Sequence, residues 1–364
     1  MSARDARTGP VRATTGKRGR RDASSRSAGS GSAREGAGNV RSTGRRSGGP
    51  AQSMAAPPVD GLVVGTVPAS ARATGVLLVL AGLVGAVGVF PTYLVVGGRA
   101  LSQASGVGAV VIALLVPVAH LLVGAGLARG RVPKFGLAYA GVAGALALGQ
   151  FLIEVYRGSS STDRPGVEVL AGERVLTSSV EAGAGWVLGL VALGLTVLAA
   201  CVASVAWGRT VMEDGGTLDS ARSGLAGAAV LLGVLTVLCL SLPAADVPDQ
   251  LSTDPVTGMQ TVVTREGPQA LLERPGLALL GGLLLAGAVV LCAVIAPSLR
   301  PRLAAVGGLL ALTVAVLSAG LLGARDALHS PDLEWTLPGI GLVFAGLAFA
   351  GLTVVAWRIG RGRP

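Results

Sequence analysis

The stretch VLLVLAGLVGAVGVF, residues 76–90, decides the fold, because it is apolar on every face and contains no charged residue. A membrane core of about 30 Å is crossed by roughly 20 helical residues, and only helices or closed barrels satisfy their backbone hydrogen bonds there. A strand of a membrane barrel would instead alternate in polarity along about ten residues. The stretch therefore predicts a membrane-spanning helix.

Seven further stretches of the same kind follow. The predicted spans are Gly75–Val96, Gly106–Gly126, Phe135–Val155, Gly185–Trp207, Leu225–Ala244, Leu277–Ala296, Leu303–Leu322 and Gly339–Trp357. In the first span, Pro91 is expected to leave the carbonyl of Val87 without its usual partner. The sequence thus predicts an all-α, polytopic integral membrane protein, a bundle of about eight transmembrane helices.

Basic residues indicate the orientation. With the N-terminus in the cytoplasm, the inner connections and C-terminal tail carry ten basic residues and the outer loops carry seven. The segment before the first span adds 13 more on the inner side. The positive-inside rule therefore places both termini in the cytoplasm. With only two lysines and one asparagine, the chain suggests a GC-rich bacterial genome, so we expect a bacterial plasma membrane. Because the topology explains the basic residues, we expect no nucleic-acid partner.

The chain divides by composition into three parts. Residues 1–70 are rich in Arg, Ser and Gly, and we expect a disordered basic cytoplasmic arm. Residues 71–358 form the transmembrane domain, with outer loops near 157–184, 245–275 and 323–338, and residues 359–364 form a short basic tail. The arm either binds anionic lipid head groups, at about 1 kcal/mol for each basic residue near the surface, or only fixes the topology. An organelle transit peptide is a less favoured interpretation.

Two outer loops resemble each other. Ser161, Thr162 and Asp163 recur 91 residues later as Ser252, Thr253 and Asp254. This spacing predicts a parallel duplication of two-helix hairpins, covering spans three to four and five to six. The same loops contain VEVLAGERVLT (167–177) and TGMQTVVT (257–264), whose β-branched residues beside glycine predict short β-hairpins.

Polar residues inside the spans are the candidates for a functional site. His120 lies one helical turn after Pro117, and intramembrane ionisable groups are expensive to bury. It is either functional or a neutral imidazole bonded to a carbonyl freed by Pro117 or to a hydroxyl on another helix. Gln150 and Glu154 form the other polar pair, one turn apart near the outer end of the third span. We expect Glu154 to reach the interface or to pair with Arg157.

Reactive groups are otherwise scarce. The chain lacks a GxxxxGK[ST] phosphate loop, HExxH, GxSxG and clustered aspartates, so we predict no cofactor, no metal ion and no enzymatic activity. The three cysteines lie within spans as apolar side chains. The favoured hypothesis is a non-enzymatic envelope scaffold or regulatory component with a membrane-protein partner or a second copy of itself. The alternative is a permease for a small or lipid-like substrate, and an intramembrane enzyme acting on lipid comes last.

Overall fold

The structure is a computed structural model that describes residues 62–96, 98–159, 167–170, 173–176, 180–214, 218–246, 250–253, 260–263, 270–272, 276–329 and 334–359. All of these residues belong to one compact unit. The predicted arm up to residue 61 and the tail after residue 359 lie outside the described residues. The predicted disorder was wrong for residues 62–70, because Leu62–Val64 forms a paired strand and the first helix begins at Ala69. Disorder of residues 1–61 and their attraction to anionic lipid stay predictions.

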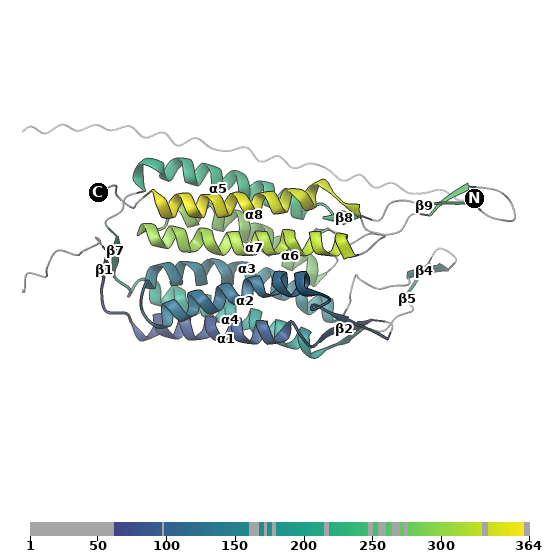
Figure 1. The fold of residues 1–364 in the computed structure, drawn as a ribbon, viewed down its shortest axis with the longest axis horizontal. Coiled ribbons are helices and arrows are strands. Elements are labelled where there is room, and N and C mark those ends of the chain that lie inside the picture. The colour runs from purple at the N-terminus through teal and green to yellow at the C-terminus, as the bar shows by residue number, and fades with distance from the viewer. Residues whose placement is uncertain are drawn as a thin grey trace, which may run out of the picture. The chain divides into compact units, whose positions relative to one another are not determined.

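Eight helices of the described chain are long and apolar enough to cross a membrane, which confirms the predicted all-α, multi-pass bundle. They lie side by side, with the first strand and the end of the last helix at the same end of the bundle (Figure 1). The helices are α1 (Ala69–Gly88), α2 (Val107–Ala128), α3 (Pro133–Ser159), α4 (Ala184–Trp207), α5 (Asp219–Leu240), α6 (Leu277–Ile295), α7 (Arg302–His329) and α8 (Leu337–Arg358). A short 3₁₀ turn, η1 (Ala296–Ser298), follows α6.

The first span ends earlier than predicted. Helix α1 stops at Gly88, and Thr92–Val96 forms strand β2. The expectation of a helix running through Pro91 was therefore wrong, because proline disfavours the helical conformation of the residue before it and the Thr-Tyr-Leu-Val-Val run favours a strand. The carbonyl of Val87 is not left alone, since it accepts a hydrogen bond from the backbone N–H of Phe90 at 3.3 Å.

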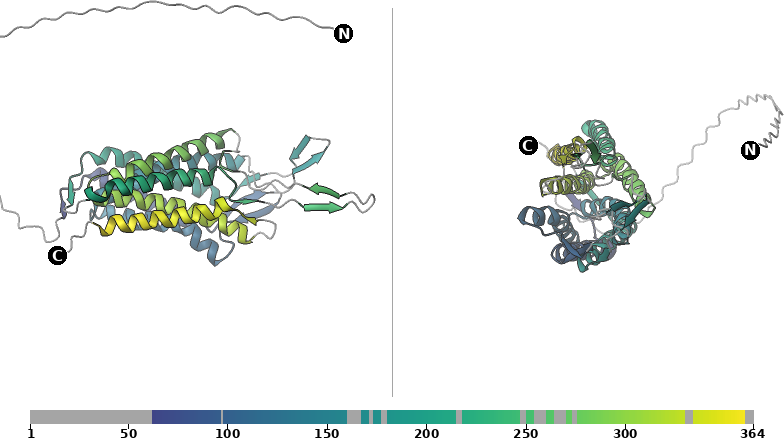
Figure 2. Two further views of the ribbon diagram at one scale, coloured as in Figure 1. Left: turned by 90° about the horizontal axis from the view of Figure 1, so that it is seen from above. Right: turned by 90° about the vertical axis from the view of Figure 1, so that its right-hand side faces the viewer.

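Short strands lie at both ends of the helices (Figure 2). The end that holds the C-terminus of α8 carries one antiparallel pair, β1 (Leu62–Val64) with β7 (Met212–Asp214). The opposite end carries two sheets and two hairpins. The sheets are β3 (Arg99–Ser102)–β2–β6 (Val180–Ala182) and β8 (Ala245–Asp246)–β11 (Glu334–Trp335), and the hairpins are β4 (Val167–Leu170)–β5 (Glu173–Leu176) and β9 (Gln250–Thr253)–β10 (Gln260–Val263). The hairpin predicted within residues 167–177 is thus confirmed. In the second hairpin only β10 lies within the predicted residues 257–264, and its partner β9 precedes them.

The second four helices repeat the arrangement of the first four. Helix α1 contacts α2 and α4, and α4 contacts α3; in the same way α5 contacts α6 and α8, and α8 contacts α7. Between the two groups, α3 contacts α7 and α6, while α7 contacts α3 and α2. Exchanging α1–α4 with α5–α8 leaves this pattern unchanged. The bundle is therefore two four-helix repeats related by a pseudo-two-fold axis beside α3 and α7.

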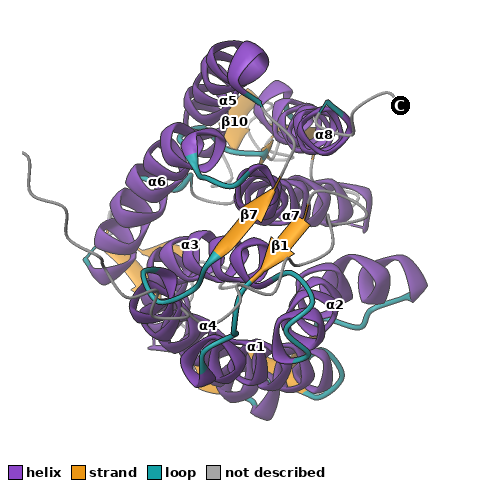
Figure 3. Ribbon diagram, turned by 90° about the vertical axis from the view of Figure 1, so that its left-hand side faces the viewer, coloured by secondary structure: helices purple, strands orange, loops and turns teal. Residues whose placement is uncertain are grey.

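Strand pairing follows the same symmetry. In the first repeat the strand after α1 pairs with the strand before α4, with Leu94 opposite Ala182. In the second, the strand after α5 pairs with the strand before α8, and Asp246 stands opposite Glu334, each 152 positions later. The pair β1–β7 joins the segments before α1 and α5 and crosses the end of the bundle near α3 and α7 (Figure 3). Because β1 and β7 precede α1 and α5 at one end, the repeats are parallel.

At the same end of each repeat, a basic side chain contacts a tryptophan. Lys134, at the start of α3, lies 5.5 Å from the ring centroid of Trp207 at the end of α4. At the equivalent place, Arg302 at the start of α7 donates from Nη1 to the backbone carbonyl of Trp357 at 3.2 Å. Each basic residue follows a proline, and each tryptophan ends the sequence Val-Ala-Trp. The two repeats therefore resemble each other in these side-chain contacts as well as in the arrangement of their helices.

This four-helix repeat differs from the duplication predicted from the 91-residue spacing. That spacing equates α3 with α5, yet α3 contacts α4, α6 and α7 at the centre, whereas α5 contacts α6 and α8 only among the principal helix pairs. The two helix pairs that the spacing equates, α3–α4 and α5–α6, therefore occupy different environments in the bundle. The spacing itself remains a pattern of the sequence that the contacts do not explain.

Small residues set the closest helix contacts. A Cβ atom added at Gly75 of α1 would lie 2.8 Å from the carbonyl oxygen of Gly124 on α2. A Cβ atom at Gly281 of α6 would lie 2.7 Å from the carbonyl oxygen of Gly149 on α3. Apolar burial adds little drive between helices in lipid, so such backbone approaches, with their dispersion contacts, are what hold the helices together.

Replacing Arg302 with methionine is expected to lower thermal stability. Arg302 is buried, and loss of a charged hydrogen-bond donor beside the last turn of α8 costs about 1.5–3 kcal/mol. The measurement is the melting temperature of the monodisperse protein in mild detergent. Arg209→Met, at an exposed position after α4, is the control and should leave the melting temperature unchanged. Equal melting temperatures for the two variants would contradict the role assigned to Arg302.

Candidate functional site

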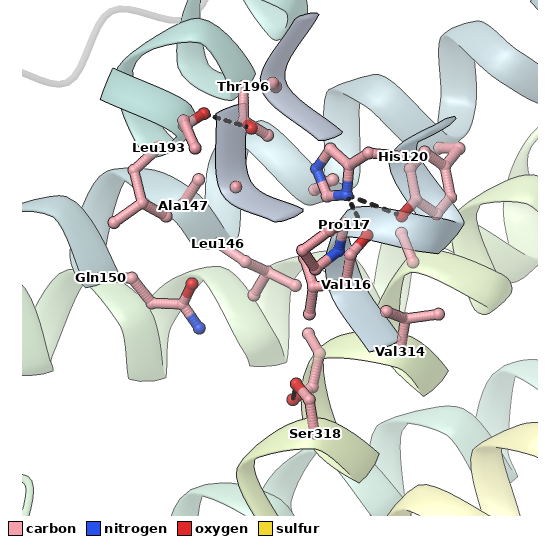
Figure 4. Close-up of a pocket in the computed structure, with 17 residues that line it drawn as sticks. Val116, Pro117, His120, Leu146, Ala147, Gln150, Leu193, Thr196, Val314 and Ser318 are labelled. Atoms are coloured by element: carbon pink, nitrogen blue, oxygen red, sulfur yellow. Dashed lines mark hydrogen bonds between the residues drawn. The ribbon is translucent and has the colours of Figure 1, made fainter. Parts of the chain in front are cut away.

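A cavity of about 90 Å³ lies inside the bundle, between α1, α2, α3, α4 and α7 (Figure 4). Most of its wall is alanine, valine, leucine and proline. None of the residues that line it is charged. Five polar side chains also face it, and they are His120, Tyr139, Gln150, Thr196 and Ser318. Since these polar groups come from four different helices, only the folded bundle brings them together.

The two central helices contribute the same face to this cavity. From α3 come Ala143, Leu146, Ala147 and Gln150, and from α7 come Ala311, Val314, Ala315 and Ser318. Each α7 residue lies 168 positions after its α3 counterpart, the same separation that relates Lys134 to Arg302. The cavity therefore lies where the two repeats meet, beside the pseudo-two-fold axis. The first repeat closes it further with α1, α2 and α4.

His120 is held by two partners. Its Nδ1 lies 2.8 Å from the carbonyl oxygen of Val116 and 3.3 Å from the hydroxyl of Tyr139. A carbonyl oxygen can only accept, so Nδ1 must carry the hydrogen and donate it. In the uncharged ring Nε2 is then an acceptor. Within the described part of the chain Nε2 has no hydrogen-bond partner, which leaves it available to a molecule in the cavity.

Tyr139 completes this pair from the neighbouring helix. It is 1 % exposed, and its ring meets the imidazole edge to face, with centroids 5.6 Å apart and an angle of 79° between the planes. The single Nδ1 hydrogen lies between two acceptors, the Val116 carbonyl at 2.8 Å and the Tyr139 oxygen at 3.3 Å, so the hydrogen of the Tyr139 hydroxyl is not given to His120 and can be donated elsewhere. The predicted hydrogen bond of His120 to a hydroxyl on another helix is confirmed by Tyr139. The predicted bond to the carbonyl freed by Pro117 was wrong, because the carbonyl that His120 contacts is that of Val116 on its own helix.

The two hydroxyls of the cavity donate to their own helices. Thr196 Oγ1 donates to the carbonyl of Ala192 at 2.8 Å, and Ser318 Oγ donates to the carbonyl of Ala315 at 2.9 Å. Each oxygen keeps its lone pairs, so each can still accept a hydrogen bond. Gln150 extends its amide beside them (Figure 4). The polar side of the cavity is thus rich in acceptors.

Glu154 lies outside this cavity. Its carboxylate is 3.4 Å from Arg157 Nη1, which confirms the predicted ion pair, and Arg157 also donates to the hydroxyl of Tyr93 at 3.4 Å. The backbone carbonyl of Glu154 accepts from Trp186 Nε1 at 2.9 Å. The three predicted candidates therefore separate: His120 and Gln150 share the cavity, and Glu154 belongs to an interfacial cluster that joins α3, α4 and β2.

Metal ligands are not clustered in the described residues. No group of three or more His, Cys, Asp or Glu side chains there could hold a metal ion. Cys201, Cys239 and Cys292 are free thiols. The side chains that line the cavity offer hydrogen bonding and shape.

Sequence reasoning missed Tyr139 and treated Thr196 and Ser318 as packing groups. Tyr139 is one of three tyrosines, and it lies four residues after the predicted start of the third span, which was a usable signal. A second signal was the Val-Ala-Trp sequence, which ends both the fourth span at Trp207 and the eighth at Trp357. Aligning the chain on that sequence would have predicted a four-span repeat.

Comparison with protein-family models, with curated proteins and with solved structures finds no match for this chain. No relative therefore lends a function to the cavity. What it can bind has to be inferred from the side chains that line it and from its place between the repeats.

Proposed function

We propose that this multi-pass membrane protein is a permease that passes a small uncharged molecule through the cavity between its two repeats, without catalysing a reaction. The observation that carries the proposal is that α3 and α7 turn the same four positions toward one cavity beside the pseudo-two-fold axis. In transporters built from repeats, substrate sites lie near the membrane midplane at the repeat interface, and the repeats rock around them.

The lining favours an uncharged substrate. An ion taken from water into the membrane interior requires a counter-charge, and no residue that lines the cavity supplies one. Proton-coupled carriers use carboxylates at membrane depth, and the described carboxylate nearest to the cavity along α3, Glu154, is paired with Arg157. The proposal is therefore facilitated passage and not coupled transport.

Proteoliposomes test this function directly. The purified full chain is reconstituted, and the rate of swelling after mixing with urea, formamide, acetamide or glycerol is followed by stopped-flow light scattering. At least one solute should enter faster than it enters protein-free vesicles of the same lipid. Identical rates for all four solutes would remove the proposal.

A scaffold is the second candidate, and the outer hairpins favour it. Hairpins β4–β5 and β9–β10 contain two strands each, and among the described strands no other strand pairs with them. An isolated two-stranded hairpin is marginal in water, and its free edges can accept a strand from a partner. If this protein organises an envelope complex, a stoichiometric partner should copurify in mild detergent and be lost when residues 250–263 are replaced by a Gly-Ser linker.

The orientation and the membrane also belong to this proposal. Lys134, Arg302 and Arg358 start or end helices at the end of the bundle that holds β1, and the positive-inside rule favours the cytoplasm for that end. We place the chain in a bacterial plasma membrane with both termini in the cytoplasm. Alkaline phosphatase fused after residue 359 should then be inactive, whereas an insertion after residue 253 should be active.

A further inference from the structure

We infer that the cavity selects a small uncharged molecule that donates hydrogen bonds through N–H or O–H groups, the class that includes short amides and short polyols. The inference rests on the proposed function, because this molecule is the one that would be passed. It follows from three properties of the cavity: its hydrogen-bond acceptor atoms, its volume, and a lining without charged residues.

Acceptors dominate the polar wall. Nε2 of His120 accepts because Nδ1 holds the hydrogen. The hydroxyl oxygens of Thr196 and Ser318 accept because their hydrogens go to Ala192 and Ala315 on their own helices. A ligand that has only acceptors would leave Nε2 of His120 unpaired and would make no hydrogen bond to the lone pairs of the two hydroxyls, which is costly inside the bundle. A ligand with two or more donors satisfies them.

Two groups can complete the recognition of such a molecule. The Tyr139 hydrogen can be donated to it, since that hydrogen is not given to His120. The Gln150 amide has both a carbonyl and an NH₂ group beside the cavity (Figure 4). A molecule with one carbonyl or hydroxyl acceptor and several donors matches this set, as amides and polyols do.

The space limits the size of the molecule. A cavity of about 150 Å³ holds benzene, with six carbon atoms, so on the same scale about 90 Å³ takes about four non-hydrogen atoms. Urea and acetamide each have four. Apolar side chains from all five helices cover most of the rest of the wall, so a longer polar molecule would face apolar groups.

Acetamide and acetone separate donation from size. Both have four non-hydrogen atoms and a carbonyl, but only acetamide has N–H donors. Saturation-transfer NMR of the full chain in mild detergent should show transfer to acetamide and at least a threefold weaker signal for acetone. Equal signals, or no signal for acetamide, would overturn the inference.

Matched variants assign the signal to the cavity. Thr196→Val combined with Ser318→Ala removes two acceptors and should weaken acetamide binding by on the order of three- to tenfold. Thr236→Val is the control, because Thr236 is equally buried and bonded to its own helix but does not line the cavity. Thr196→Ser keeps the hydroxyl and should bind like the wild type, so a lost signal there would overturn the role assigned to that hydroxyl. An equal loss in Thr236→Val would also overturn the assignment.

Binding and passage fail in different ways. If acetamide binds and no solute enters vesicles faster, the ligand class stands and the permease proposal falls. If solutes enter faster but the rate is the same in the Thr196→Val and Ser318→Ala double variant, the permease proposal stands and the inferred ligand class is wrong.

Discussion

Replacing Gly149 with valine is expected to abolish the folded bundle. Gly149 lies on α3 where α6 passes, and a Cβ atom there would lie 2.6 Å from the carbonyl oxygen of Gly281 and 2.6 Å from the backbone nitrogen of Leu285. Backbone atoms cannot rotate away, so the two helices would have to separate. Overpacking of side chains costs about 1–3 kcal/mol, and a clash with backbone on both sides should cost at least about 3 kcal/mol.

The matched control for this substitution is Gly141→Val on the same helix. Nothing lies within 4 Å of a Cβ atom at Gly141, so the change carries the same intrinsic cost for the helix without the clash. Size-exclusion chromatography in mild detergent should show a monodisperse peak for Gly141→Val and aggregate for Gly149→Val. If both variants elute and melt alike, the close contact of α3 with α6 is not what joins the repeats.

Replacing Ala315 with leucine is expected to reduce solute passage at least tenfold while the protein still folds. Ala315 lines the cavity from α7, and leucine adds three carbon atoms to a space that takes about four non-hydrogen atoms. The side chain can enter existing space instead of displacing backbone, so the stability loss should stay within about 3 kcal/mol. The swelling rate of proteoliposomes with urea or acetamide is the measurement.

Ala143→Leu fills the same cavity from α3 and should have the same effect. The control is Ala348→Leu on α8, where the same substitution lies on an exposed face of the helix. Passage that continues unchanged in both cavity variants, with the protein monodisperse, would show that the pathway does not run through this cavity.

The candidate site was only partly predictable from the sequence. His120 and Gln150 stood out because an imidazole and an amide are rare in apolar spans, and both line the cavity. Tyr139 did not stand out, although it is the partner of His120, because a tyrosine reads as an apolar side chain until its neighbour is known. Glu154 stood out equally and is paired with Arg157 instead, three residues along its own helix.

The sequence by itself determined that the chain crosses a membrane with eight helices, because lipid admits only closed hydrogen-bonded backbone and the length of a span is fixed by the thickness of the core. Proline set where α1 ends, a local effect that can be read without neighbours. Which helices meet was decided only by the tertiary structure. The spans are apolar on every face, so their periodicity does not mark a buried side. Backbone contacts at Gly75 and Gly149, and the pairing of two four-helix repeats, select the faces that pack and create the cavity between α3 and α7.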